Sequence, residues 1–84
     1  MTEDEQIEAG QRIAAFLEDE AVKRALQRLA AKYYDEFKAA RTAEGRESAH
    51  SKAMVLDDFA NEMRSVVDTG KRVKAEVQRR ARGR

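Results

Sequence analysis

The chain has 84 residues, of which 39% are charged and 42% are hydrophobic, with no proline and no cysteine. A chain of this length forms one small domain, residues 1–84, and its apolar content is too high for a disordered segment. The lack of cysteine excludes a disulfide framework and any thiolate metal site, and no apolar run approaches the ~18 residues of a membrane span. The acidic N-terminus does not resemble a signal peptide, so we expect no contact with a membrane.

The net charge of +1 conceals a strong asymmetry between the two ends of the chain. Residues 1–20 contain seven acidic side chains and one basic side chain, a local charge of −6. Residues 71–84, KRVKAEVQRRARGR, contain seven basic side chains and one acidic side chain, a local charge of +6. Charge separated in this way is informative about contacts rather than about the fold.

The first helix is predicted at about residues 3–17. Thr2 and Glu5 have the spacing of a capping box, in which the two side chains reciprocally satisfy free backbone N–H groups. Gly10 lies inside this segment, where it weakens the helix by about 1 kcal/mol relative to alanine or allows another helix to come close. Apolar residues follow the segment at Ile7, Ile13, Phe16 and Leu17.

A second helix is predicted at about residues 20–41, with Asp19 as its N-cap. Its apolar residues recur at spacings of three and four, as in one face of an amphipathic helix. This seam consists of Val22, Leu26, Leu29, Tyr33 and Phe37.

The segment RTAEGRE, residues 41–47, predicts a short turn in which Thr42 caps a long third helix at about 44–80. The expected fold is all-α: a short N-terminal helix followed by an antiparallel helical hairpin with a long C-terminal arm. We expect the second helix to face Leu56, Phe59, Ala60 and Met63, and Leu29→Ala or Leu56→Ala to cost about 2–5 kcal/mol. The seam of the third helix reads Ala49, Ala53, Leu56, Ala60, Met63, Val67 and Gly70.

The third helix would be roughly 50 Å long at ~1.5 Å per residue, which is longer than its hairpin partner can cover. The end of the helix is therefore expected to protrude or to meet another chain. The residues predicted to mediate self-association into a homo-oligomer are Val66, Val67, Val73 and Val77.

Three short patterns that could carry chemistry have simpler explanations. Glu47 and His50 form an E-x-x-H pair, but a carboxylate-bridged metal site needs further ligands that the sequence does not supply. Asp57 and Asp58 are adjacent, so on a helix they point about 100° apart and cannot converge on one atom. Gly70-Lys71 lacks the rest of a phosphate-binding loop and fits a helix C-terminus or a weak point within the helix. We therefore expect no enzyme, no cofactor and no metal site.

The basic tail, residues 71–84, has three open interpretations. It could neutralise phosphates without reading base sequence, dock on an acidic protein such as the N-terminal segment of a neighbouring copy, or be the solvated end of a helix. Because Val73 and Val77 continue an apolar line through it, protein contact is narrowly preferred. The candidate contact residues are Lys71, Arg72, Lys74, Arg79, Arg80, Arg82 and Arg84.

Three stretches, LEDEAVKRAL, YYDEFKAARTAEGRESAH and LDDFANEMRSVVDTGK, together resemble small helical proteins encoded among the head and packaging genes of tailed bacteriophages and prophages. The resemblance covers roughly residues 12–71. It implies a viral setting, in the host cytoplasm or within the phage particle, and a capsid, portal or packaging protein as partner, but it carries over no site residues.

The expected function is accordingly a non-enzymatic assembly or virion-associated protein that acts by helix-mediated contacts. A nucleic-acid-binding accessory protein that uses residues 71–84 is the alternative, and a host-directed inhibitor is the third possibility.

Overall fold

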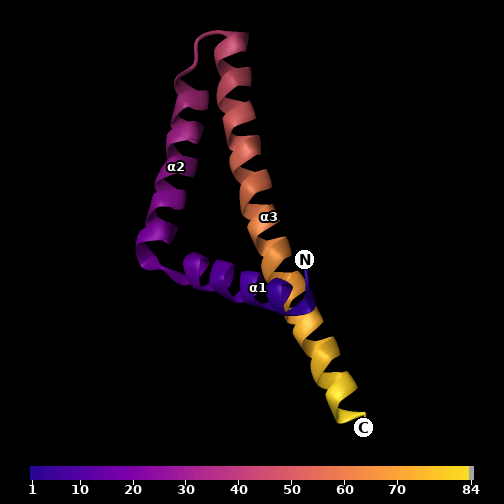
Figure 1. Cartoon of the computed structure of the whole chain (residues 1–84). Helices are drawn as coiled ribbons and strands as arrows, with labels where there is room; N and C mark the ends of the chain where they lie inside the picture. Colours follow the sequence, from indigo (N-terminus) through magenta and orange to yellow (C-terminus); the bar gives the residue numbers. More distant parts are fainter. Residues whose placement is uncertain (84) are drawn as a thin grey trace. The chain divides into compact units, whose positions relative to one another are not determined.

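The computed structural model describes residues 1–83, and these form three α-helices and no strand. The helices are α1 (Glu3–Glu18), α2 (Glu20–Ala39) and α3 (Ala43–Arg82), and they follow one another with very short connections (Figure 1). The prediction of an all-α chain is confirmed, with helix ends within two residues of those expected. In the part of the chain that is described, no helix has the length and apolarity needed to cross a membrane.

Side-chain caps explain where the helices begin. The Thr2 hydroxyl accepts a hydrogen bond from the backbone N–H of Glu5 at 3.1 Å. The same hydroxyl donates a hydrogen bond to the Glu5 carboxylate at 3.0 Å. Asp19 accepts the backbone N–H groups of Ala21 and Val22, at 2.9 and 3.1 Å, and starts α2. Thr42 starts α3 by accepting the backbone N–H of Gly45 at 3.0 Å. The predicted caps at Asp19 and Thr42 are confirmed.

The chain divides into two compact units, and α3 contributes to both. The first unit combines Met1–Glu18, which includes α1, with the part of α3 that starts at Glu62. The second unit is Asp19–Asn61, which contains α2 and the first part of α3. We refer to them as the α1 unit and the α2 unit.

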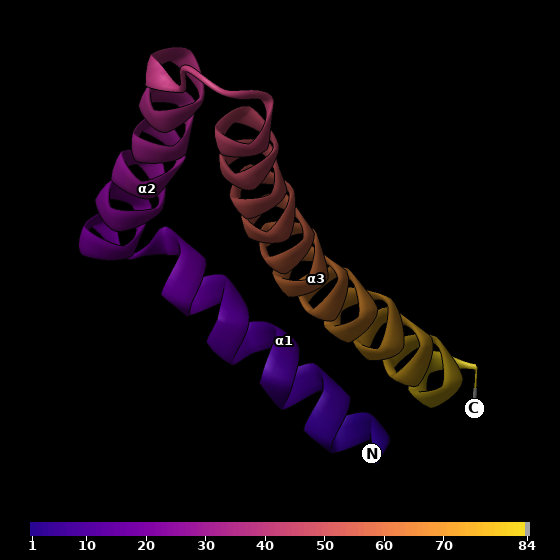
Figure 2. The same ribbon diagram turned by 90° about the horizontal axis from the view of Figure 1, so that it is seen from above.

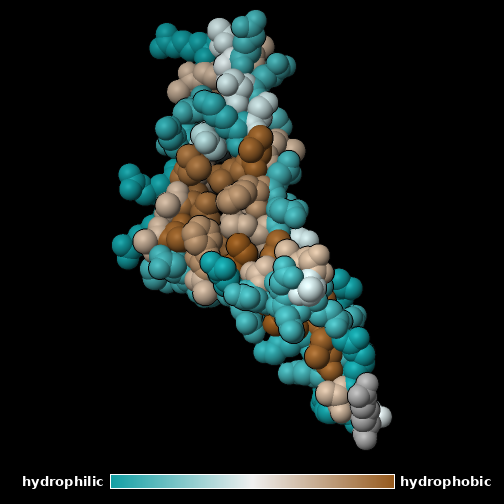
Figure 3. All heavy atoms as spheres, in the orientation of Figure 1, coloured by the Kyte–Doolittle hydropathy of each residue, from teal (hydrophilic) through white to brown (hydrophobic). Residues whose placement is uncertain are grey.

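In the α2 unit, α2 and the first part of α3 run in opposite directions on either side of the turn that joins them (Figures 1 and 2). An ion pair links the two helices, since Lys52 Nζ lies 3.3 Å from Glu36 Oε2. The predicted seam residues Leu26, Leu29 and Leu56 are half-buried. Apolar side chains gather where these two helices adjoin (Figure 3).

The α1 unit contains a helix pair that the apolar pattern of the sequence did not predict. Here α1 packs on the second part of α3, and Met63 and Val73 are buried, at 5% and 6% exposure. Met63 was expected to belong to the pair of the second and third helices, but it lies in the part of α3 that belongs with α1. The expectation that the end of α3 lacks cover within the chain is therefore wrong at Val73.

Candidate interaction surfaces

Gly10 of α1 and Gly70 of α3 lie at a close contact between the two helices of the α1 unit. A methyl group placed on Gly10 would lie 3.0 Å from the Cα atom of Gly70 and 3.1 Å from the carbonyl oxygen of Val66. A methyl group on Gly70 would lie 3.0 Å from the carbonyl oxygen of Gln6. The two backbones thus approach so closely that even a methyl group at either position would force the neighbouring backbone to shift. Gly70 lies inside the continuous helix α3 and does not end it.

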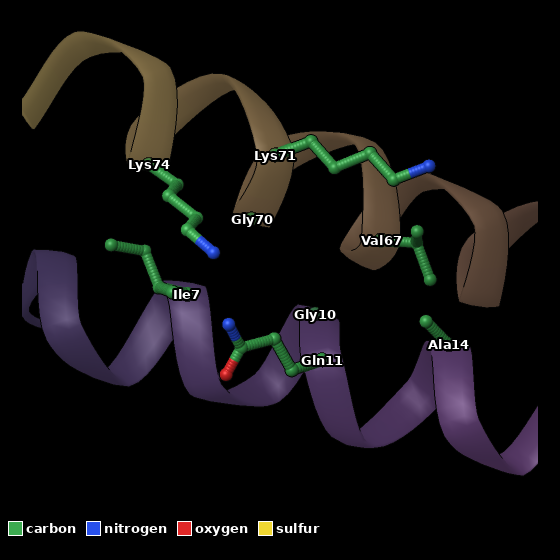
Figure 4. Close-up of a pocket in the computed structure, with 8 residues that line it drawn as sticks. All are labelled: Ile7, Gly10, Gln11, Ala14, Val67, Gly70, Lys71 and Lys74. Atoms are coloured by element: carbon green, nitrogen blue, oxygen red, sulfur yellow. The ribbon is translucent and has the colours of Figure 1, made fainter. Parts of the chain in front are cut away.

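A small hollow of about 210 Å³ accompanies this crossing, and its wall is mostly apolar, with Ile7, Ala14 and Val67 among the residues that line it. Figure 4 shows Gly10 and Gly70 facing each other, with Val67 near Ala14 and the Lys74 side chain pointing toward α1. Lys74 is therefore oriented to the α1 side of α3, whereas the side chain of Lys71 extends along α3. The hollow contains no cluster of groups that could carry out a reaction.

An ion pair joins the acidic beginning of the chain to its basic end. Nη2 of Arg80 lies 2.7 Å from both carboxylate oxygens of Glu3. The hydrogen bond that Arg80 donates to Glu3, followed by the negative charge of Glu3, raises the pKa of Arg80. One of the seven predicted contact residues of the tail is thus engaged within the chain, by the acidic segment that was considered as a docking partner from a neighbouring copy.

The four valines predicted to mediate self-association differ in their burial. Val73 is buried, and Val66, Val67 and Val77 are half-buried. Val66 and Val67 lie at the contact with α1, because one is next to Gly10 and the other lines the hollow. Much of this apolar line is covered inside the α1 unit, so it no longer requires a second chain.

Three further arginines of the tail lie on the side of α3 that faces away from α1. Arg72, Arg79 and Arg82 are exposed, and within residues 1–83 none of them forms an ion pair. Lys71 is also exposed and lies at the edge of the hollow. Arg84 falls outside the described residues.

The α2 unit exposes several large apolar and aromatic side chains. On α3, Val55 is 67% exposed and Phe59 is 54% exposed. They are four residues apart and so share one face of the helix. The other side chains of this kind in the unit are Tyr34, Phe37 and Met54. In α2, all of whose residues are described, none is buried.

The residues that could carry chemistry do not form a site in the described structure. Glu47 and His50 line an open hollow beside Phe37, at the start of α3. Among residues 1–83 no group of three or more His, Asp or Glu side chains is placed to hold a metal ion. Asp57 and Asp58 are both exposed.

The sequence contains signals for the α1 contact. Gly10 is a position at which another helix can come close, and Gly70 belongs to the seam of the third helix. The opposite charges of residues 1–20 and 71–84 also indicated that the two ends attract each other. Taken together, these features would have favoured α1 as the partner of the end of α3.

Comparison of the chain with models of protein families, with curated proteins and with solved structures finds no match.

Proposed function

We propose that this protein is a non-enzymatic helical assembly protein that acts by apolar contacts between its α2 unit and another protein chain. The observation that carries the proposal is the incomplete core of this unit. Ala49 is buried there, at 3% exposure, but the unit's large side chains are half-buried or exposed. Two helices alone leave part of each apolar face in water, and further helices are needed to cover it.

The first partner we propose is a second copy of the chain. Small domains often gain stability by oligomerisation, and two helical hairpins together form a four-helix bundle. Closed two-fold dimers are the commonest oligomers, and they bring the same patch of each copy together. Val55 and Phe59 would then cover the same residues of the partner.

The setting we propose is the assembly of a phage particle, with a capsid, portal or packaging protein as a further partner. This part of the proposal rests on the resemblance of the three sequence stretches described above. Mass spectrometry of purified particles tests it, once the phage that encodes the chain is in hand. Absence of the chain both from particles and from their assembly intermediates would contradict it.

Sedimentation equilibrium at micromolar concentrations tests self-association directly. We expect a species heavier than the 9.5 kDa monomer, and we expect the double variant Val55→Lys/Phe59→Lys to sediment as a monomer because two desolvated charges would oppose docking. The matched control is Gln27→Lys/Ala31→Lys, which makes a similar addition of charge at exposed positions of α2 outside its seam. A monomeric wild type, or a control that dissociates as fully as the double variant, would refute the proposed surface.

A further inference from the structure

Three arginines of α3 are placed together on the side of the helix that α1 leaves open. Arg79 follows Gly70 by nine positions, and Arg82 follows Val73 by nine positions. At about 100° per residue, nine positions amount to half a turn beyond two full turns, so each arginine lies opposite a residue that packs on α1. Arg72 follows Gly70 by two positions, about 200°, and belongs to the same side. We call Arg72, Arg79 and Arg82 the arginine face.

From this placement we infer that the arginine face binds the phosphate backbone of nucleic acid. Guanidinium groups present a planar fork of donors that suits phosphate oxygens, and they keep their charge at any ordinary pH. Along the helix axis, Arg72 and Arg79 are about 10 Å apart and Arg79 and Arg82 about 4.5 Å apart. A helix with positive charges at these intervals can contact several phosphates of one DNA strand or of both strands.

The covered valines remove the reason to prefer a protein partner for this segment. The apolar line through the tail includes Val73, which is buried, and Val77, which is half-buried. The arginine face itself has no large apolar side chain, and such anchors usually supply the affinity of a protein interface. A helix that lies on a membrane also needs an exposed apolar side, whereas the apolar side of this segment is directed to α1.

Neighbouring charges define the extent of the face. Lys71 lies beside it and adds positive charge. Asp68 precedes Gly70 by two positions and lies on the same side as the arginines, four positions before Arg72, and Glu76 lies at the border of the face; both acidic residues reduce its total charge. Arg80 is excluded because Glu3 binds it. No aromatic side chain lies beside the three arginines in the described part of the chain, and Gln78 is the one amide side chain next to them. One amide is too few to read a base sequence, so we expect binding that is independent of base sequence.

Fluorescence anisotropy with two labelled DNA duplexes of unrelated sequence, at 50 and 200 mM salt, tests the inference. Three phosphate contacts give a slope of about −2.7 in the logarithmic plot of affinity against salt, which corresponds to a loss of about 40-fold between these concentrations. Both duplexes are expected to bind alike. The variant Arg72→Ala/Arg79→Ala/Arg82→Ala should bind at least about 30-fold more weakly at 50 mM salt and should show a nearly flat slope.

Two control variants separate the arginine face from net charge. Arg24→Ala/Arg28→Ala/Lys32→Ala removes the same charge from exposed positions of α2, and Arg80→Ala removes the paired arginine of the tail. Both are expected to keep most of the wild-type affinity and slope, with circular dichroism confirming that every variant is helical. If the triple-arginine variant loses its helix, the single change Arg79→Glu replaces it and should weaken binding by at least tenfold.

Several results would overturn the inference. One is a wild-type protein that shows no salt-sensitive binding to either duplex. Others are an α2 control that loses as much affinity as the triple-arginine variant, or a triple-arginine variant that binds like the wild type. Tighter binding to polyglutamate or to vesicles containing phosphatidylserine than to the duplexes would assign the face to an acidic protein or to a membrane instead.

Discussion

At the scale of single residues, Gly10 and Gly70 decide where α1 lies on α3. A glycine inside a helix costs about 0.5–1 kcal/mol relative to alanine, since it loses more backbone freedom on folding. The cost of the two glycines is offset here by the contact between the two backbones, which larger side chains would prevent. The sequence allowed the prediction that Gly10 could admit another helix. Gly10 by itself could not identify that helix, because a glycine has no side chain whose pattern points to a neighbour, and only the opposite charges of the chain ends indicated the partner.

Replacing Gly70 by leucine tests this contact. Leucine has a better helix propensity than glycine, yet its side chain would push against the backbone of α1, so we expect a net loss of about 1–3 kcal/mol in the free energy of unfolding. Ala75→Leu is the control at an exposed position of the same helix and should change the stability by less than about 0.5 kcal/mol. Urea unfolding followed by circular dichroism measures both. Equal stability of the two variants would show that the close crossing does not exist.

Asp19 provides a second test at this scale, because its carboxylate accepts two backbone N–H groups at the start of α2. Asp19→Ala should lower the free energy of unfolding by about 0.5–2 kcal/mol, whereas Asp19→Ser should retain most of the cap. Asp35→Ala, at an exposed position inside α2, removes the same charge without a cap and should be nearly neutral. Thermal unfolding compares the three variants, and an Asp19→Ala protein as stable as Asp35→Ala would disprove the capping role.

At the scale of elements, the three helices and their ends followed from the sequence because caps and apolar spacing are local properties. The pairing of α3 did not follow, because its seam recurs every 3.5 residues on average. Such a seam drifts by about 20° per heptad around a straight helix, so it turns by about 60° between Ala49 and Gly70. A single straight neighbour cannot follow it throughout. The seam of α3 is therefore divided, with its first part in the unit of α2 and its second part in the unit of α1, whereas the sequence pattern predicted a single partner.

The two parts of α3 should therefore respond differently to truncation of a seam residue. Met63 is buried, so Met63→Ala should cost about 2–5 kcal/mol. Leu56 is half-buried, so Leu56→Ala should cost only about half as much in the monomer, less than its place in the seam had predicted. Urea unfolding at low micromolar concentration measures both. A larger loss for Leu56→Ala than for Met63→Ala would mean that the α2 unit holds the main core.

At the scale of the whole molecule, the charge asymmetry of the sequence has a structural counterpart in the Glu3–Arg80 pair. Both side chains remain at least half exposed, at 50% and 61%, so the pair orients the chain ends more than it stabilises them. The sequence therefore indicated correctly that the ends carry information about contacts. The sequence alone did not distinguish Arg80, which is paired with Glu3, from the arginine face, because that distinction depends on which side of α3 faces α1.

Coupling between folding and self-association gives the last prediction. If a second copy covers the α2 unit, the folded dimer gains stability with protein concentration by mass action. A hundredfold increase, from 5 to 500 µM, corresponds to about 2.7 kcal/mol, and a domain of this size should then unfold roughly 10 °C higher. The Val55→Lys/Phe59→Lys variant cannot gain in this way, so its midpoint should stay constant over the same range. Calorimetry or circular dichroism measures both proteins. If the unfolding midpoint of the wild type does not change with concentration, the exposed apolar side chains of the α2 unit do not bind a second copy of the chain, and their partner is a different protein.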